Sequence, residues 1–211
     1  MRKKLDKDMT HTEMVNKWLR MGGDKTLRLN YDLNEDSIVI DGGGYLGEWA
    51  NDIYNKYSCN VHIFEPVKKY YDLISEKFKD NNKVRVYHCG LSNSNRNLDI
   101  TISNDASSIY TKGSEKDTTE SIELVDIKEF LNKLDIKDVD LMKLNVEGEE
   151  YNILDRMIEV DMVNDFDNLQ IQFHRFVDDY DNRKTKIETE ILKSHAPTYE
   201  YNYVWVNYKK N

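Results

Sequence analysis

The chain has 211 residues, of which 39 are acidic and 30 are basic, so its formal net charge is −9. An acidic chain without a dominant basic segment is a poor candidate for a general binder of nucleic-acid backbones. The N-terminal residues lack an apolar signal-peptide core, and no apolar run approaches the roughly 18 residues of a membrane span. The two cysteines, Cys59 and Cys89, suit neither a disulfide framework nor a metal cage. We therefore expect a cytoplasmic protein with no nucleic-acid partner and no membrane span, and a homo-oligomer stays open.

Up to residue 90 the apolar residues follow two alternating patterns. Short continuous apolar runs are typical of strands buried in a parallel sheet, and apolar residues three or four apart are typical of amphipathic helices. In chain order they predict a helix at 9–21, a strand at 37–40, a helix at 49–57, a strand at 61–64, a helix at 67–78 and a strand at 84–90. The order of strands and helices after residue 37 implies right-handed crossovers and a parallel sheet.

The second half begins differently. Apolar and polar residues alternate at both ends of the segment 97–125, which predicts inserted β segments around a polar loop at 103–119, long enough to act as a lid. The patterns that follow predict a helix at 127–134, a strand at 139–146, a helix at 151–158, a strand at 169–173, a helix at 181–193 and a strand at 199–208. Since no linker or repeat is visible, we expect a single domain over 1–211, with 1–30 as an N-terminal helical extension. The fold class is α/β in three layers, a mostly parallel central sheet with helices on both faces.

Four of the nine glycines lie within six positions, directly after the predicted strand at 37–40. They are Gly42, Gly43, Gly44 and Gly47. At the carboxyl edge of a parallel sheet, glycine lets the backbone approach a ligand closely. Glu65 ends the next predicted strand, where a carboxylate can accept the hydroxyl protons of a ribose. Loop and acid together predict a site for a ribose-bearing ligand.

The glycine cluster fits two motifs. Gly42, Gly44 and Gly47 match the G-x-G-x-x-G of dinucleotide-binding proteins, which leaves an NAD-dependent oxidoreductase as an alternative. Starting at Asp41, the segment also matches D-x-G-x-x-x-G, with Gly43 and Gly47 as its glycines. An anionic side chain would repel phosphates but suits a cationic ligand with an amino group and a sulfonium, such as S-adenosylmethionine.

Six segments carry the motifs of a known family. They are IVIDGGGYLGEWA, IFEPVKKYYDLI, Cys89–Ser92, Ala106–Ile109, LVDIKEFL and LMKLNVEGEEYNIL, the last close to the signature K-I-D-V-E-G-x-E. Across residues 26–175 the chain thus resembles the FkbM-type family of S-adenosylmethionine-dependent methyltransferases, within the Rossmann-like class I methyltransferase fold. The resemblance implies O-methylation of a sugar hydroxyl in a glycan or a related secondary metabolite, so the partner is a small-molecule or glycan acceptor. The cofactor-binding residues that it implies are Asp41, Gly42, Gly43, Gly44, Tyr45, Gly47, Glu65, Pro66, Cys89, Gly90, Leu91 and Asn145.

Two positions depart from the family pattern. Asn145 stands where the family has an aspartate before V-E-G, and Gln172 stands where a glutamate is often found. Because an amide cannot take a proton, these residues cannot act as general bases, although the Asn145 carbonyl still accepts hydrogen bonds. The changes leave a third hypothesis open, a methyltransferase-like binding protein that has lost its base.

Catalytic candidates follow the last two predicted parallel strands. Glu147 and His174 are the candidate bases for deprotonating a hydroxyl, and Asn145, two residues before Glu147, is the third candidate for the catalytic site. Glu147 fits equally a charge that stabilises a helix N-terminus, and His174 fits an ordinary surface histidine. Lys143 is either the partner of a carboxylate in the cleft or a buried, paired charge. The metal requirement is open, since no His/Cys cluster predicts a metal site.

Overall fold

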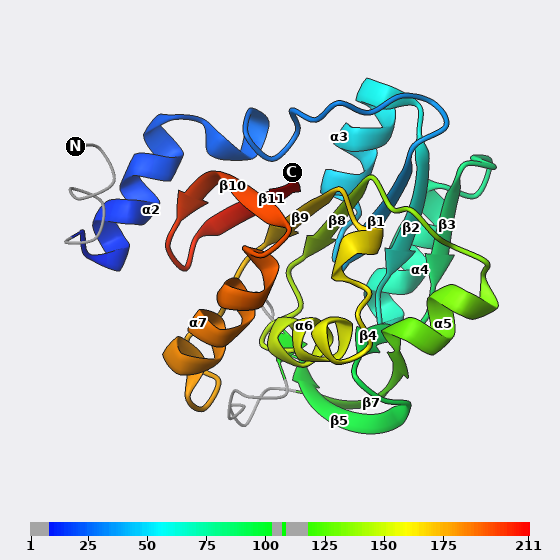
Figure 1. Ribbon diagram of the computed structural model, residues 1–211. Coiled ribbons are helices and arrows are strands. Elements are labelled where there is room, and N and C mark those ends of the chain that lie inside the picture. Colours follow the sequence, from blue (N-terminus) through cyan, green and yellow to red (C-terminus); the bar gives the residue numbers. More distant parts are fainter. Residues whose placement is uncertain (1–8, 103–106, 109–117) are drawn as a thin grey trace.

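The computed structural model describes residues 9–102, 107–108 and 118–211. Its centre is a seven-stranded sheet in the order β10-β11-β9-β8-β1-β2-β3 (Figure 1). The strands are β1 (Ile38–Gly42), β2 (Asn60–Phe64), β3 (Val84–Tyr87), β8 (Leu141–Leu144), β9 (Asn168–Ile171), β10 (His195–Tyr201) and β11 (Trp205–Lys210). Strands β3, β2, β1, β8 and β9 pair in parallel, whereas β11 pairs antiparallel with both β9 and β10. The mostly parallel sheet is therefore confirmed.

Helices cover both faces of this sheet. On one face α5 (Ile127–Lys133), α6 (Glu150–Glu159) and α7 (Tyr180–Ile191) share a core with Ile40 and Met142. On the other, α3 (Glu48–Tyr57) and α4 (Lys68–Lys77) pack on Val39 and Leu141. Val39 and Ile40 face opposite sides because successive residues of a strand alternate. The three-layer α/β fold is confirmed.

Helix α2 (His11–Arg20) lies beside the hairpin of β10 and β11 (Figure 1). Thr10 caps it, accepting from the Glu13 backbone N–H while the Glu13 carboxylate accepts from the Thr10 N–H. Trp18 packs edge-on against Tyr201, with ring centroids 5.1 Å apart. Two short 3-10 turns, η1 (Gly23–Lys25) and η2 (Val163–Asp165), complete the helical elements of the described residues. None of the helices in these ranges has the length and apolar character needed to cross a membrane.

A second sheet lies at the lower edge of Figure 1, near α5 and α6. Its strands are β4 (Gly90–Ser92), β5 (Arg96–Ile102), β6 (Ser107–Ser108) and β7 (Thr118–Asp126), in the order β4-β7-β5-β6. The alternating residues near 98–102 and 122–124 lie on β5 and β7, which pair antiparallel. Most of the expected lid loop, including the motif residues Ala106 and Ile109, lies outside the described residues.

Two predicted strands are divided in the structure. The strand expected at 84–90 splits into β3 of the central sheet and β4 of the second sheet. The single strand expected at 199–208 is wrong, because the chain turns back after Tyr201 and forms the β10–β11 hairpin. Tyr203 makes this turn with a φ of 57°, a conformation that few residues adopt.

Candidate active site

The glycine cluster forms the turn between β1 and α3. Gly43 has a φ of 81° and Gly47 a φ of 69°, in the left-handed region that favours glycine. A Cβ on Gly43 would lie 2.0 Å from the backbone carbonyl oxygen of Asn145, and a Cβ on Gly44 would lie 2.4 Å from the Ile63 side chain. The turn therefore packs directly against the residue that follows β8, as close backbone approach requires.

A buried ion pair lies beneath the turn. The parallel register places Asp41 beside Lys143, and Lys143 Nζ donates to Asp41 Oδ1 over 2.8 Å. The same ammonium donates to the carbonyl oxygens of Gly43 (2.7 Å) and Gly42 (3.3 Å). Burial lowers the pKa of Lys143, while the Asp41 carboxylate opposes this effect. Lys143 thus pairs with a carboxylate and also holds the glycine turn in place.

Two acceptors at this edge have no donor among the described residues. Asp41 Oδ2 and Asn145 Oδ1 are both buried and make no hydrogen bond there. An unpaired buried acceptor costs free energy, so such atoms point to a donor that a ligand supplies. The amide of Asn145 retains the accepting oxygen that an aspartate would offer.

Glu65 directly follows β2, the strand next to β1, and is only 4% exposed. Its Oε2 accepts from the Tyr45 backbone N–H (2.8 Å) and its Oε1 from the Val67 N–H (2.9 Å). Burial raises the pKa of Glu65 to about 7, although these two hydrogen bonds oppose the shift. Each carboxylate oxygen keeps a further lone pair, which a ribose hydroxyl could use.

Next to Glu65, the ring of Pro66 lies against Gly90, where an added Cβ would be 3.4 Å from Pro66 Cγ. The side chains of Cys89 and Leu91 point into the hydrophobic core. Burial raises the pKa of the Cys89 thiol to about 12, so it stays protonated at neutral pH. Cys89 and Leu91 can therefore reach a ligand at this edge only through their backbone.

Glu147 and His174 meet at the ends of β8 and β9. His174 Nε2 lies 3.6 Å from Glu147 Oε1, and its Nδ1 lies 3.1 Å from Glu150 Oε1. Burial lowers the pKa of His174, but the two carboxylates outweigh this effect and raise it to about 9. The interpretation of His174 as an ordinary surface histidine is wrong, since its side chain is only 12% exposed.

Glu147 lies before α6, which begins at Glu150, so it does not belong to the first helical turn. Its φ of 50° is unusual for a residue with a side chain, and Gly148 follows with a φ of 105°. Both residues lie in the turn between β8 and α6, and this turn brings the Glu147 carboxylate to 3.6 Å from His174 Nε2. The geometry thus directs Glu147 towards His174, and its helix-terminal interpretation is not supported.

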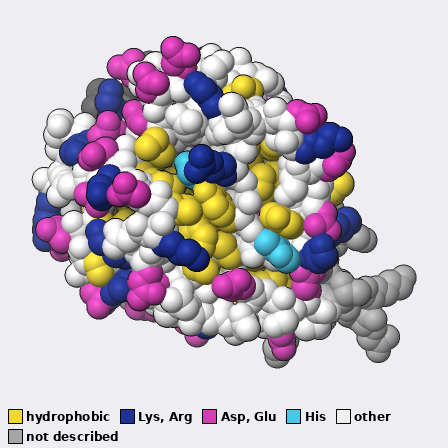
Figure 2. All heavy atoms as spheres, turned by 90° about the vertical axis from the view of Figure 1, so that its right-hand side faces the viewer, with side chains coloured by type: hydrophobic (Ala, Val, Ile, Leu, Met, Phe, Trp, Pro, Cys, Tyr) yellow, Lys and Arg dark blue, Asp and Glu magenta, His cyan; other side chains and the backbone are white. Residues whose placement is uncertain are grey.

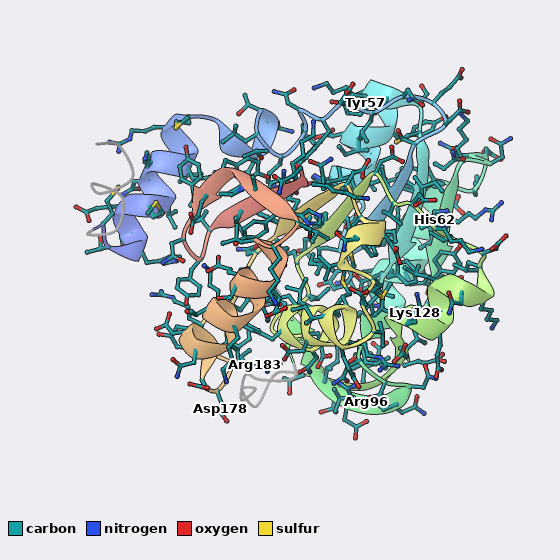
Figure 3. The ribbon with its side chains drawn as sticks, viewed as in Figure 1. Tyr57, His62, Arg96, Lys128, Asp178 and Arg183 are labelled. Atoms are coloured by element: carbon teal, nitrogen blue, oxygen red, sulfur yellow. The ribbon has the colours of Figure 1, made fainter. Side chains whose placement is uncertain are left out.

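The start of α6 is also tied to the second sheet. Arg96 on β5 donates to both carboxylate oxygens of Glu149 (2.9 and 3.0 Å), and the Ser92 hydroxyl donates to Glu149 Oε2 over 2.6 Å. From the other side, Arg183 on α7 donates to Asn152 over 3.0 Å. Figure 3 shows Arg96 and Arg183 on the two sides of α6. Sequence reasoning missed Arg96, Glu149 and Glu150, because their partners are distant in the sequence.

A cavity of about 630 Å³, which the sequence did not predict, lies at the opposite edge of the sheet. Tyr57 lines this cavity, and Figure 3 shows it far from Arg96, which pairs with Glu149 at the start of α6. Its other walls include Tyr31, Tyr199 and Asn207. No residue of the predicted site lines this cavity. Within the described ranges, no cluster of His, Cys, Asp and Glu side chains is suited to holding a metal ion.

The family model described as "Methyltransferase FkbM domain" matches residues 41–198 of this chain. The chain belongs to the FkbM methyltransferase family. The match favours a methyltransferase over the oxidoreductase alternative that the glycine motif left open. A search of curated protein sequences finds no match.

Solved structures support the same fold for this FkbM protein. A Clostridium thermocellum protein, provisionally described as an rRNA methylase, has a TM-score of 0.57 at 10% identity, over 90% of this chain and 94% of that one. A Streptococcus mutans protein, provisionally described as a methyltransferase and solved with S-adenosylhomocysteine, has a TM-score of 0.53 at 12% identity, over 92% and 97%. The precorrin-6y C5,15-methyltransferase of Geobacter metallireducens has a TM-score of 0.51 at 10% identity, over 89% and 87%.

These structures, two of whose descriptions name different acceptors, show the class I methyltransferase fold, and the S-adenosylhomocysteine bound in one of them agrees with the methyltransferase family match. The fold does not define the acceptor, because function lies in the site and not in the fold. The expectation that nucleic acid is excluded therefore gains no support from these structures for the FkbM protein.

Proposed function

We propose that this FkbM protein is a cytoplasmic, single-domain O-methyltransferase that uses S-adenosylmethionine to methylate a sugar hydroxyl in a glycan or a related secondary metabolite. The observation that carries the proposal is that the Glu147–His174 pair shares the carboxyl edge of the sheet with two buried acceptors, on Asp41 and Asn145, that have no donor in the described part of the chain. A cofactor and a hydroxyl acceptor can meet at such an edge.

The residues present fit this cofactor. Its α-ammonium group can donate to Asp41 Oδ2 and Asn145 Oδ1, which lack donors among the described residues. Its ribose hydroxyls can donate to the Glu65 carboxylate, whose two oxygens each accept one backbone N–H and keep a further lone pair. Bound S-adenosylmethionine would supply a methyl group already activated on a sulfonium. The Asp41 Oδ2 acceptor suits an ammonium donor of this cofactor, whereas the phosphates of NAD carry no donor at neutral pH.

The chain's own contribution to the reaction is positioning and proton acceptance. A sugar hydroxyl is a poor nucleophile, so a base within hydrogen-bond reach accelerates its attack. With a pKa of about 9, His174 holds a proton at neutral pH, and the Glu147 carboxylate is then the group that accepts the hydroxyl proton. Asn145 cannot replace it, since an amide does not take up a proton. No metal is needed for these roles.

The choice of a carbohydrate over a nucleic acid rests on charge. The net charge is −9, and a polyanionic acceptor would be repelled. Figure 2 shows the side of the molecule at the right of Figure 1, where Lys and Arg side chains are interspersed with Asp and Glu around hydrophobic ones. A mixed surface of this kind suits a neutral acceptor better than a phosphate backbone.

Transfer of a labelled methyl group from S-adenosylmethionine tests the proposal. We expect label on hydroxyl-rich carbohydrate acceptors, none on RNA, and a loss of at least about 100-fold in Glu147→Gln, the usual size of a general-base effect. Glu159→Gln is the matched control, since Glu159 is an exposed glutamate of α6 paired with Arg156. Label on RNA alone would contradict the acceptor class. Tight cofactor binding without transfer to any acceptor would favour the binding-protein hypothesis.

A further inference from the structure

Glu150 is a fully buried carboxylate at the first position of α6 that the proposed proton transfer does not use. Its Oε2 accepts from the Gly148 backbone N–H over 2.9 Å. Its Oε1 accepts from the His174 backbone N–H over 2.8 Å and lies 3.1 Å from His174 Nδ1. One side chain thus joins the turn after β8, the start of α6 and the residues after β9.

These contacts fix the imidazole ring at both ends. Nδ1 faces Glu150, and Nε2 faces Glu147 at 3.6 Å. The Tyr151 hydroxyl donates to the His174 carbonyl oxygen over 2.8 Å, which also holds the backbone. A helix N-terminus alone explains a carboxylate near Gly148, but it does not explain one that meets a histidine ring.

Few charged groups among the described residues face the His174 ring. The turn before α6 contributes Glu147, and α6 itself contributes Glu150. Arg175 follows His174 in the chain, but the charged groups that act on the His174 pKa are Glu147 and Glu150. Phe176 packs near the ring, with centroids 5.2 Å apart, and carries no charge. The carboxylates of Glu147 and Glu150 therefore dominate the protonation of His174.

We propose that Glu150 is a positioning residue: it fixes His174 with Nδ1 protonated, so that Nε2 faces Glu147 and the acceptor. The functional role of this arrangement rests on the proposed methyl transfer, whereas the contacts between Glu150 and His174 do not depend on it. A buried acid that orients a histidine in this way sets both its tautomer and its basicity. Glu150 thereby keeps Glu147 paired with an imidazolium at neutral pH.

Histidine-selective NMR of the whole chain tests this role without turnover. The His174 signals, assigned with a His174→Gln sample, should titrate near pH 9 in the wild type and keep a proton on Nδ1. In Glu150→Gln the midpoint should fall by at least about 1 unit, because loss of a facing carboxylate removes a stabilised charge. Glu149→Gln is the matched control, since Glu149 is an adjacent buried glutamate paired with Arg96. Its midpoint should stay at the wild-type value.

The rate of methyl transfer should follow the same titration. In Glu150→Gln the pH profile of the methyl-transfer rate should shift to lower pH, together with the NMR midpoint of His174. The affinity for S-adenosylhomocysteine should stay near the wild-type value. An unchanged midpoint and profile would overturn the role of Glu150. If the variant does not fold, a wild-type His174 that titrates near 6.5 overturns it as well. Failure of the proposed function would appear separately, as absent S-adenosylhomocysteine binding with the titration intact.

Discussion

Replacing Gly43 by alanine tests the contact on which the cofactor edge is built. The residue has a φ of 81°, where a side chain costs about 1–2 kcal/mol. In addition, the new Cβ would lie 2.0 Å from the backbone carbonyl oxygen of Asn145, which no rotamer change can relieve. The turn and the residues after β8 must separate, and overpacking of this kind costs about 1–3 kcal/mol. We expect a total loss of about 2–5 kcal/mol in the free energy of unfolding.

Gly22→Ala is the matched control for this change. Gly22 has a φ of 61°, and nothing lies within 4 Å of its added Cβ. It should lose only the conformational cost, about 1–2 kcal/mol. Urea unfolding followed by tryptophan fluorescence measures both variants, and calorimetry measures their affinity for S-adenosylhomocysteine. Separation of the turn displaces the acceptors of Asp41 and Asn145, so Gly43→Ala should lose at least about tenfold in affinity, or 1.4 kcal/mol. Equal stability of the two variants, together with wild-type affinity of Gly43→Ala for S-adenosylhomocysteine, would refute the close contact between Gly43 and the Asn145 carbonyl oxygen.

Three further predictions concern charged groups. Since burial raises the pKa of Glu65 to about 7, the affinity of the wild type for S-adenosylhomocysteine should fall about tenfold per pH unit below that value. Glu65→Gln should bind this ligand weakly at every pH. A wild-type affinity that is constant from pH 5 to 8 contradicts the role of the Glu65 carboxylate. Because the His174 pKa is raised from 6.5 to about 9, its pairing should contribute on the order of 3 kcal/mol to stability below pH 6.5, which is lost as the pH rises through 9. Urea unfolding at pH 6 and pH 10 should therefore separate wild type and His174→Gln only at the lower pH. Arg96→Met should cost about 2–3 kcal/mol, because the buried Glu149 carboxylate loses its charged partner and retains neutral donors such as the Ser92 hydroxyl. Adding Glu149→Gln should restore part of this stability; a double variant as unstable as the sum of the single ones would argue against the pair.

The positions of the glycine turn and Glu65 at one sheet edge could be predicted from the sequence because their signals are local. The glycine cluster follows a buried strand directly, and Glu65 ends the next one, so both positions at one edge follow from the parallel arrangement. The pairing of Asp41 with Lys143 could only be named as an option. It depends on the register of β1 and β8, which lie about a hundred residues apart in the chain.

Elements without local turn signals were the ones predicted wrongly. The β10–β11 turn lacks glycine and proline and places Tyr203 at a positive φ, so the aromatic segment resembles one continuous strand. At the start of α6, Glu149 and Glu150 are neighbours of the same type. Glu149 pairs with Arg96 and Glu150 with His174, and only the tertiary structure distinguishes the two roles.

Calorimetric titration of the whole chain with S-adenosylhomocysteine and, separately, with NAD distinguishes the proposed cofactor from the dinucleotide alternative. The buried acceptors of Asp41 and Asn145 and the carboxylate of Glu65 predict micromolar binding of S-adenosylhomocysteine and no binding of NAD. Asp41→Asn should weaken the binding of S-adenosylmethionine more than that of S-adenosylhomocysteine, since only the former carries the sulfonium charge. Binding of NAD without binding of S-adenosylhomocysteine would contradict the account.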